Sequence, residues 1–191
     1  MTEEEFVAWS DEDTRAEWVD GEIELMSPAN VTHLRLTRWL VMVLGGFIEA
    51  HDLGELFAIE SMVRFASQRR RRLPDLHFVS KNRLQIVRET YIDGAPDLIV
   101  EIVSPDSVVR DWRKKYIEYE KAGVREYWVI DPIHRQVEAY SLRGRRYVQT
   151  EPADDRIDSV VLPRFFLKPQ WLWRQPLPPT RTALRQLGVK P

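Results

Sequence analysis

The sequence predicts a single α/β domain in which a mixed β-sheet is flanked by helices. Residues 98–103 are almost continuously apolar, which is typical of a central strand that is covered on both faces. Residues 31 to about 51 carry apolar side chains at helical spacing. Strand patterns and helical patterns alternate along the chain, which favours helices packed against a sheet. The length of 191 residues suits one domain.

The first part of the chain predicts a hairpin, a long helix and further strands. Asp20-Gly21 lies between two short apolar runs within residues 16–26, a strong signal for a two-residue hairpin turn. Asn30 suits the N-cap of the helix that follows. The apolar stripe of this helix consists of Leu36, Leu40, Val43 and Phe47, and Gly54 lies just past its end. The next segments predict a strand or hairpin at 55–66, a basic loop at 68–72 and a short strand at 74–80.

The second part predicts two more strands, a helix and a second hairpin. We expect a short helix within 80–90, a buried strand within 95–105, a helix over 107–122 that ends at Gly123, and a strand over 125–132. A hairpin follows within 136–150, turned at Arg143-Gly144. Residues 162–173 are apolar and should pack back on the body. The domain is therefore expected to cover 1–174, and 175–191 to form a loose Pro-rich tail with one short helix at 180–187.

The composition excludes several classes of site. The chain has no cysteine, which rules out disulfides, Cys-ligated zinc, iron–sulfur clusters and thiol catalysis. The net charge is −2, so any surface for nucleic acid must be a local basic patch. The acidic N-terminus lacks the pattern of a signal peptide. The longest apolar stretch, 40–48, is shorter than the roughly 20 residues of a bilayer span. We expect a soluble, cytoplasmic protein with no membrane partner.

Glu101 is the most unusual residue of the predicted central strand. A carboxylate within a buried strand costs several kcal/mol unless it is paired or binds a metal. A purely structural ion pair is one interpretation, and a metal ligand is the other.

Two Pro-Asp pairs compete for the role of a second carboxylate. Asp97 and Glu101 are four residues apart on one strand, so their Cα atoms would be about 13 Å apart at roughly 3.3 Å per residue. That separation is too large for one Mg²⁺, whose ligand oxygens lie about 2 Å from the ion. Asp75 lies on a different strand and is free to sit beside Glu101. We therefore predict Asp75 and Glu101 as the metal pair and Asp97 as an accessory or structural residue.

Lys115 is the predicted third member of the site. On a helical wheel, Lys115 falls inside the apolar face made by Trp112, Tyr116, Tyr119 and Ala122. A lysine directed at the sheet can neutralise a buried glutamate or position a water molecule. The alternative is a side chain whose stem covers apolar surface while the amine reaches solvent.

Basic residues near the predicted site are candidates for binding phosphates. The run Arg69, Arg70, Arg71 and Arg72 comes just before Asp75, and Arg110 and Arg113 flank the same region. By itself the run is more simply a solvated loop. His33, near the start of the long helix, could reach the site, although a lone helix histidine is more often structural.

The central run PDLIVEIVSPDSVVRDWRKKYIEYEKAGVREYWVIDP resembles the Uma-type family, which is classed with the restriction endonucleases and was formerly a domain of unknown function. The segments WVDGEIELMSPAN and PDLHFVS and the helix that carries His33 follow the same pattern in the same order. The resemblance spans roughly residues 15–173. It implies the restriction-endonuclease-like fold of the PD-(D/E)XK nuclease superfamily.

The resemblance also implies a metal site and an activity. Asp75 matches the first carboxylate and Glu101 the acid of the E-x-K strand, with the backbone carbonyl of Ile102 as a further ligand of Mg²⁺ or Mn²⁺. Val103 occupies the usual lysine position, and Lys115 looks like a migrated replacement. Glu60 and Asp97 are carried over as accessory ligands. The implied activity is metal-dependent endonucleolytic hydrolysis of phosphodiester bonds in DNA.

Two other functions fit the same sequence. The chain could be a nucleic-acid-binding module that has the fold without catalysis. It could also be an oligomeric interaction protein, since seven tryptophans, including Trp171 and Trp173, could form an interface. A homodimer is favoured among oligomers because cleavage of both strands of DNA needs two sites.

Overall fold

The computed structural model describes residues 1–11, 13–58, 60–104 and 110–190, and it leaves the side chains of 110–112 undescribed. Within these ranges the helices are α1 (Glu3–Trp9), α2 (Val31–Ala50), α3 (Arg110–Ala122), α4 (Pro169–Leu172) and α5 (Thr180–Gln186), with 3-10 turns η1 (Ala66–Gln68) and η2 (Lys81–Ile86). The strands are β1 (Ala16–Val19), β2 (Glu22–Leu25), β3 (Gly54–Ala58), β4 (Met62–Phe65), β5 (Arg70–Arg72), β6 (Leu76–Ser80), β7 (Tyr91–Asp93), β8 (Leu98–Ile102), β9 (Glu126–Asp131), β10 (Gln136–Arg143), β11 (Arg146–Gln149), β12 (Ile157–Asp158) and β13 (Phe166–Leu167).

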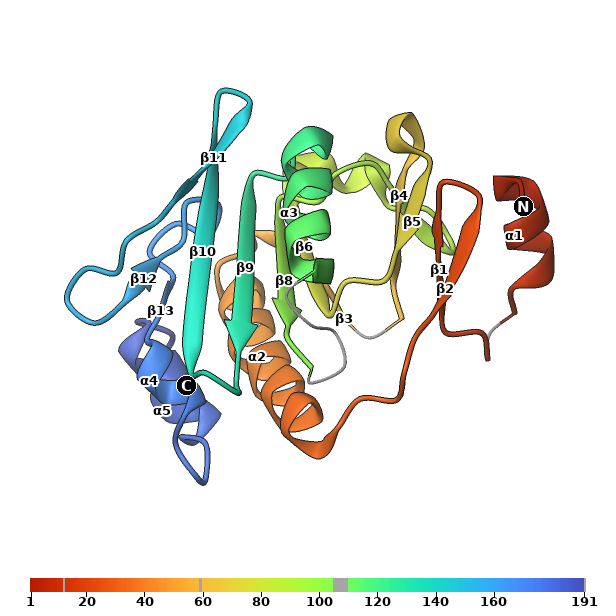
Figure 1. Ribbon diagram of the computed structural model, residues 1–191. Coiled ribbons are helices and arrows are strands. Elements are labelled where there is room, and N and C mark those ends of the chain that lie inside the picture. Colours follow the sequence, from red (N-terminus) through yellow and green to blue (C-terminus); the bar gives the residue numbers. More distant parts are fainter. Residues whose placement is uncertain (12, 59, 105–109, 191) are drawn as a thin grey trace.

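The strands form two mixed sheets and one small pair. The larger sheet has the order β11-β10-β9-β8-β6-β3, and the smaller has the order β2-β1-β5-β4-β7 (Figure 1). Strands β12 and β13 pair with each other. The pairs β8–β9 and β4–β7 are parallel, whereas the other pairs in the two sheets are antiparallel. The prediction of a mixed α/β architecture is confirmed.

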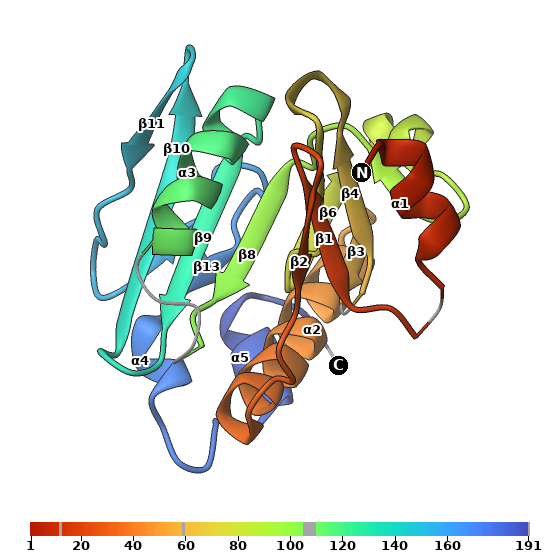
Figure 2. The same cartoon turned by 45° about the vertical axis from the view of Figure 1, so that its right-hand side comes forward.

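Helices α2 and α3 cover opposite faces of the larger sheet (Figure 2). Leu40, Val43 and Phe47 of α2 pack in one core cluster with Leu98 and Val100 of β8. Alternate residues of the same strands face the other way, so Ile99 joins a second cluster with Tyr119 of α3 and Tyr127 of β9. This alternation of side chains covers β8 on both faces, as its apolar sequence predicts.

Helix α2 begins as the sequence predicts, since the Asn30 side chain accepts a hydrogen bond from the backbone N–H of His33. By length and composition α2 could also cross a membrane, but 44% of its most apolar window is buried inside the protein. Its end meets β3 at Gly54, whose φ is +144°. A Cβ atom there would lie 2.2 Å from the carbonyl oxygen of Val79, so only glycine fits.

The N-terminal hairpin has the predicted turn and a defined register. Asp20 and Gly21 both have positive φ, at 53° and 98°, as a two-residue hairpin turn requires. The resulting register pairs Glu17 on β1 directly with Glu24 on β2. Two like charges therefore face each other across the hairpin.

Several local predictions were wrong. Residues 68–72 are not a loop, because Arg70–Arg72 form β5 between β1 and β4. The segment 55–66 is not a hairpin, because β3 and β4 belong to different sheets. Helix α1 was missed, although its capping box of Thr2 and Glu5 is a recognised start signal. The second hairpin turns at Gly144 and Arg145, one residue later than expected, because Arg143 pairs with Arg146.

The C-terminal residues pack on the body and do not form a loose tail. Helix α5 lies against α2, and Ala183 and Leu187 are buried in the same core cluster as α2. The indole N–H of Trp39 donates to the carbonyl oxygen of Pro178 at 2.7 Å. The apolar residues of this Pro-rich segment therefore contribute to the core of the domain.

Candidate metal centre

Asp75 lies directly before β6, opposite the end of β8. The antiparallel register pairs Leu76 with Val100, and one further step along both strands places Asp75 opposite Glu101. The Oδ2 atom of Asp75 accepts a hydrogen bond from the backbone N–H of Ile102 at 2.7 Å. Directly opposed residues of an antiparallel pair have Cβ atoms about 5 Å apart. The two carboxylates predicted as the metal pair are therefore neighbours.

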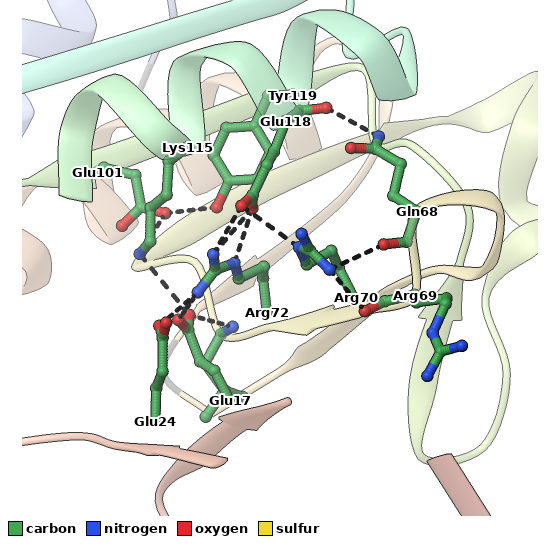
Figure 3. A network of polar contacts seen from close by, with 11 residues as sticks. Glu17, Glu24, Gln68, Arg69, Arg70, Arg72, Glu101, Lys115, Glu118 and Tyr119 are labelled. Carbon is green, nitrogen blue, oxygen red and sulfur yellow. Dashed lines mark hydrogen bonds and ion pairs between the residues drawn. The ribbon is translucent and has the colours of Figure 1, made fainter. Parts of the chain in front are cut away.

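Glu101 points from β8 toward α3 (Figure 3). Its Oε1 atom accepts hydrogen bonds from Lys115 Nζ at 3.0 Å and from the Tyr119 hydroxyl at 2.7 Å. Burial raises the pKa of Glu101 to about 7, because the negative charges of Asp75 and Glu17 add to the desolvation and together outweigh the attraction of Lys115. A carboxylate in such surroundings gains strongly from an additional cation.

Lys115 comes from the face of α3 that the helical wheel predicts, and it lies between two carboxylates. Its Nζ atom is 3.0 Å from Glu101 Oε1 and 3.6 Å from Glu17 Oε1. Burial by itself lowers the pKa of Lys115, but the charges of Glu101 and Glu17 outweigh burial and raise it. The lysine is therefore held in its charged form, and its amine is turned into the protein rather than to solvent.

Glu17 and Arg72 connect the smaller sheet to this site (Figure 3). Arg72 is 2% exposed, and its Nη1 atom donates to Glu17 at 2.6 Å and to Glu24 at 2.8 Å. Its Nε and Nη2 atoms donate to the two oxygens of Glu118 on α3, each at 2.9 Å. One guanidinium thus bridges the like-charged glutamates of the hairpin and joins β5 to α3.

His33 reaches the site from the first turn of α2. Its Nε2 atom lies 3.0 Å from Asp75 Oδ1. Burial lowers the pKa of His33, but the hydrogen bond and the charge of Asp75 outweigh it, so the pKa is raised. The carboxylate of Asp75 is therefore oriented by His33 on one oxygen and by the amide of Ile102 on the other.

Comparisons with known proteins identify the family and the fold of the chain. The family model Uma2, described as "Putative restriction endonuclease", matches residues 3–170. The chain belongs to the Uma2 family. A crystal structure of a protein from Anabaena variabilis, described as "a putative nuclease belonging to DUF820", is similar in fold, with a TM-score of 0.76. It is 20% identical in sequence, and the match covers 91% of this chain and 97% of that chain. No curated protein matches the sequence.

The fold expected of a Uma2 member is therefore present, and its two opposed carboxylates suit a hard divalent cation. Mg²⁺ is usually held by one or two carboxylates, while water and substrate phosphates complete its shell. The described residues contain no cluster of three or more acidic, histidine or cysteine side chains suited to a metal. Asp75 and Glu101, with the carbonyl of Ile102, match the smaller donor set that Mg²⁺ accepts, so the residues present fit this ion.

Two residues predicted to be accessory ligands have other partners. Asp97 is fully buried at the opposite end of β8, where it accepts hydrogen bonds from Ser80 and pairs with Arg83 and Arg125. These interactions lower the pKa of Asp97 although burial opposes them. Glu60 is half-exposed and pairs with Arg15 at 3.1 Å. The structural interpretation of Asp97 accounts for its position.

The arginines predicted to clamp phosphates are mostly engaged within the protein. Arg72 is buried as described, Arg71 donates to Glu3 at 2.8 Å, and Arg70 pairs with Glu118 at 3.4 Å. Arg69 is exposed and pairs with Asp20. Strand β5 is therefore a structural element whose cations balance internal carboxylates. Arg113 is exposed on α3, and the side chain of Arg110 lies outside the described residues.

Glu17 was missed as a member of the site, and Arg72 was predicted to bind phosphate rather than these carboxylates, although a signal for their pairing existed. The Asp20-Gly21 turn fixes a register that places Glu17 opposite Glu24, and like charges directly opposed are destabilising without a cation between them. The run of arginines at 69–72 was the available source of that cation. Tyr119 was recognised as apolar surface of α3, but its hydroxyl also donates to Glu101.

Proposed function

We propose that the chain is a metal-dependent endonuclease that hydrolyses phosphodiester bonds in DNA. The observation that carries the proposal is the placement of Asp75 opposite Glu101, with Lys115 Nζ 3.0 Å from Glu101 Oε1. Membership of the Uma2 family supports the reaction class. Glu101, Ile102 and Lys115 line a pocket together with residues of both sheets, among them Glu17.

In the proposed site, each side chain either holds the metal ion or orients a ligand of that ion. The chemistry that Mg²⁺ would supply when bound is Lewis acidity toward a phosphate oxygen and a water molecule. Asp75 and Glu101 would hold the ion together with the carbonyl of Ile102. His33 keeps Asp75 in place through its Nε2 atom. Tyr119 and Lys115 fix one oxygen of Glu101 and leave the other carboxylate oxygen for the metal.

Lys115 has a second task in the proposed reaction. Its ammonium group lies next to a metal-binding carboxylate, where it would orient the attacking water or neutralise charge that develops on the phosphate. The lysine of the usual E-x-K motif would supply the same charge from β8 itself, but Val103 occupies that position and packs with apolar neighbours. Helix α3 thus presents the cation from the other side of the pocket.

Cleavage of supercoiled plasmid and of single-stranded DNA tests the proposal. The wild type, Glu101→Gln and Lys115→Ala are compared with Mg²⁺, with Mn²⁺ and with EDTA. Glu55→Gln is a matched control, because Glu55 is an exposed glutamate on the edge strand β3. We expect cleavage by the wild type and by Glu55→Gln, and none by Glu101→Gln or in EDTA. A wild type that cuts neither substrate with either metal contradicts the proposal and favours a binding module.

A further inference from the structure

A second cleft lies beside α2, and its charged side chains are of one sign. Four arginines line it: Arg35 and Arg38 on α2, Arg135 in the β9–β10 turn, and Arg174 after α4. The cleft has a volume of about 770 Å³, and no aspartate or glutamate lines it. In a chain with a net charge of −2, this is a local concentration of positive charge.

The four guanidinium groups have no carboxylate partner within the described ranges of the chain. The ion pairs of the protein involve other arginines, such as Arg70, Arg71 and Arg72. The acid that precedes the β9–β10 turn, Asp131, is already engaged by His134 at 2.7 Å and by the backbone N–H of Ile133. The cleft therefore presents cations that the protein itself does not neutralise.

The cleft and the metal centre lie at the same end of the larger sheet. Strands β8 and β9 are parallel, with Ile102 paired to Ile130, so the strand that ends at the metal centre and the strand that leads to Arg135 finish side by side. Helix α2 begins at the same end, where His33 contacts Asp75 and where Arg35 follows two residues later. Figure 1 shows the start of α2, the β9–β10 turn and the α4–α5 connection gathered at this end.

We infer that this cleft binds the phosphodiester backbone of the DNA on which the metal centre acts. The inference rests on the proposed function and identifies a path for the substrate beyond the scissile bond. Arg35, Arg38, Arg135 and Arg174 would each contact phosphates, which guanidinium groups recognise well through paired N–H donors. The residues that line the cleft include the half-buried Trp173, whose aromatic ring could stack with a base of the bound DNA.

This assignment replaces the phosphate clamp expected from residues 69–72. Phosphate contacts need cations that are exposed and unpaired, because a guanidinium already bound to a carboxylate gains little from a second anion. Arg38 and Arg174 are exposed and unpaired among the described residues, whereas Arg72 is buried between three glutamates.

Equilibrium binding of labelled DNA tests the inference. We compare the wild type with the double variant Arg38→Ala/Arg174→Ala in EDTA, using a single strand and a duplex of the same sequence, from 50 to 200 mM KCl. The control is Arg143→Ala/Arg145→Ala, which removes two exposed arginines near the far end of β10 that form no ion pair with any residue the structure describes. Arg143 and Arg135 are separated by the length of that strand, about 27 Å at roughly 3.4 Å per residue.

Loss of two phosphate contacts should lower the affinity about tenfold or more and reduce the slope of log K against log salt by about 1.8 for the duplex. The control should behave as the wild type. Equal affinity of the wild type and the cleft variant overturns the inference, as does an equal loss in the control. A cleft variant that keeps its DNA affinity but changes its molar mass in solution also overturns it, in favour of a contact between copies of the chain.

The same experiments keep the two proposals apart. If cleavage depends on Glu101 but the cleft variant binds DNA as tightly as the wild type, the proposed nuclease activity stands and the cleft does not bind the substrate. If DNA binding depends on Arg38 and Arg174 but the wild type does not cleave DNA, the cleft stands as a DNA-binding surface and the proposed nuclease activity is wrong.

Discussion

Lys115 on α3 lies 3.0 Å from Glu101 on β8 and 3.6 Å from Glu17 on β1, so one ammonium group faces carboxylates from both sheets. Without that cation, three acids would share a buried pocket, because Asp75 is close enough to raise the pKa of Glu101 further. The lysine therefore has a structural task in the resting protein in addition to the catalytic one proposed for it.

Substitution of Lys115 separates these two tasks. We expect Lys115→Ala to slow single-turnover cleavage by about 10²–10³-fold, the usual effect of removing one group that stabilises transition-state charge. Lys115→Arg keeps the charge and should restore stability, measured by urea unfolding, more fully than it restores cleavage, because the planar guanidinium places its donors differently. Cleavage by Lys115→Ala as fast as by the wild type would remove Lys115 from the mechanism.

Arg72 should be important for stability, whereas its neighbour Arg69 should not. Arg72→Ala leaves Glu17, Glu24 and Glu118 without their shared cation, and breaking a buried ion pair costs about 3–5 kcal/mol. The control Arg69→Ala removes an exposed pair with Asp20 and should change stability by less than about 1 kcal/mol. Urea unfolding of both variants measures the difference. Similar midpoints for the two would contradict a stabilising role for the buried network.

His77 should make the protein sensitive to acid. It is fully buried on β6, its Nε2 atom is 3.2 Å from the Ser61 hydroxyl, and its Nδ1 atom has no hydrogen-bond partner among the described residues. Burial lowers the pKa of His77 to about 3, below its ordinary value of 6.5. Because the pKa of His77 is lower in the folded protein, the unfolded chain binds a proton there more readily than the folded protein does. The contribution of neutral, buried His77 to stability is therefore complete above pH 6.5 and is lost as the pH falls toward 3.

The variant His77→Gln isolates this effect. From pH 6.5 to 4.5 the wild type should lose about 2–3 kcal/mol of unfolding free energy through His77 alone, at about 1.4 kcal/mol per pH unit. His77→Gln has no proton to gain and should show a correspondingly smaller loss over the same range in urea unfolding. Parallel pH profiles for the two proteins would show that His77 is not the acid-sensitive group.

The sequence predicts the parts of this protein that depend on local patterns. The turn at Asp20-Gly21, the N-cap at Asn30 and the apolar run of β8 each follow from a few adjacent residues, and each is present. The contact of Lys115 with Glu101 also follows from local geometry, since a buried acid and a lysine on the apolar face of the next helix have few other partners.

The features that could not be predicted depend on which sheet a segment joins. Residues 70–72 look like a solvated loop until β1 and β4 enclose them, and only then does Arg72 meet Glu17 and Glu118. The Pro-rich C-terminal segment looks loose because the apolar residues of α5 are buried only by packing against α2, which is distant in sequence. Pairing over long sequence distances decides these cases, and no local propensity encodes it.

Binding of Mn²⁺ to the protein without DNA tests the central claim most directly, because it does not depend on knowing the target sequence. Titration calorimetry compares the wild type with Asp75→Asn, Glu101→Gln and the exposed control Glu55→Gln. We predict one site in the wild type and in Glu55→Gln, and its loss in both Asp75→Asn and Glu101→Gln. Equal binding by all four proteins, or none by the wild type, would contradict a metal centre formed by Asp75 and Glu101.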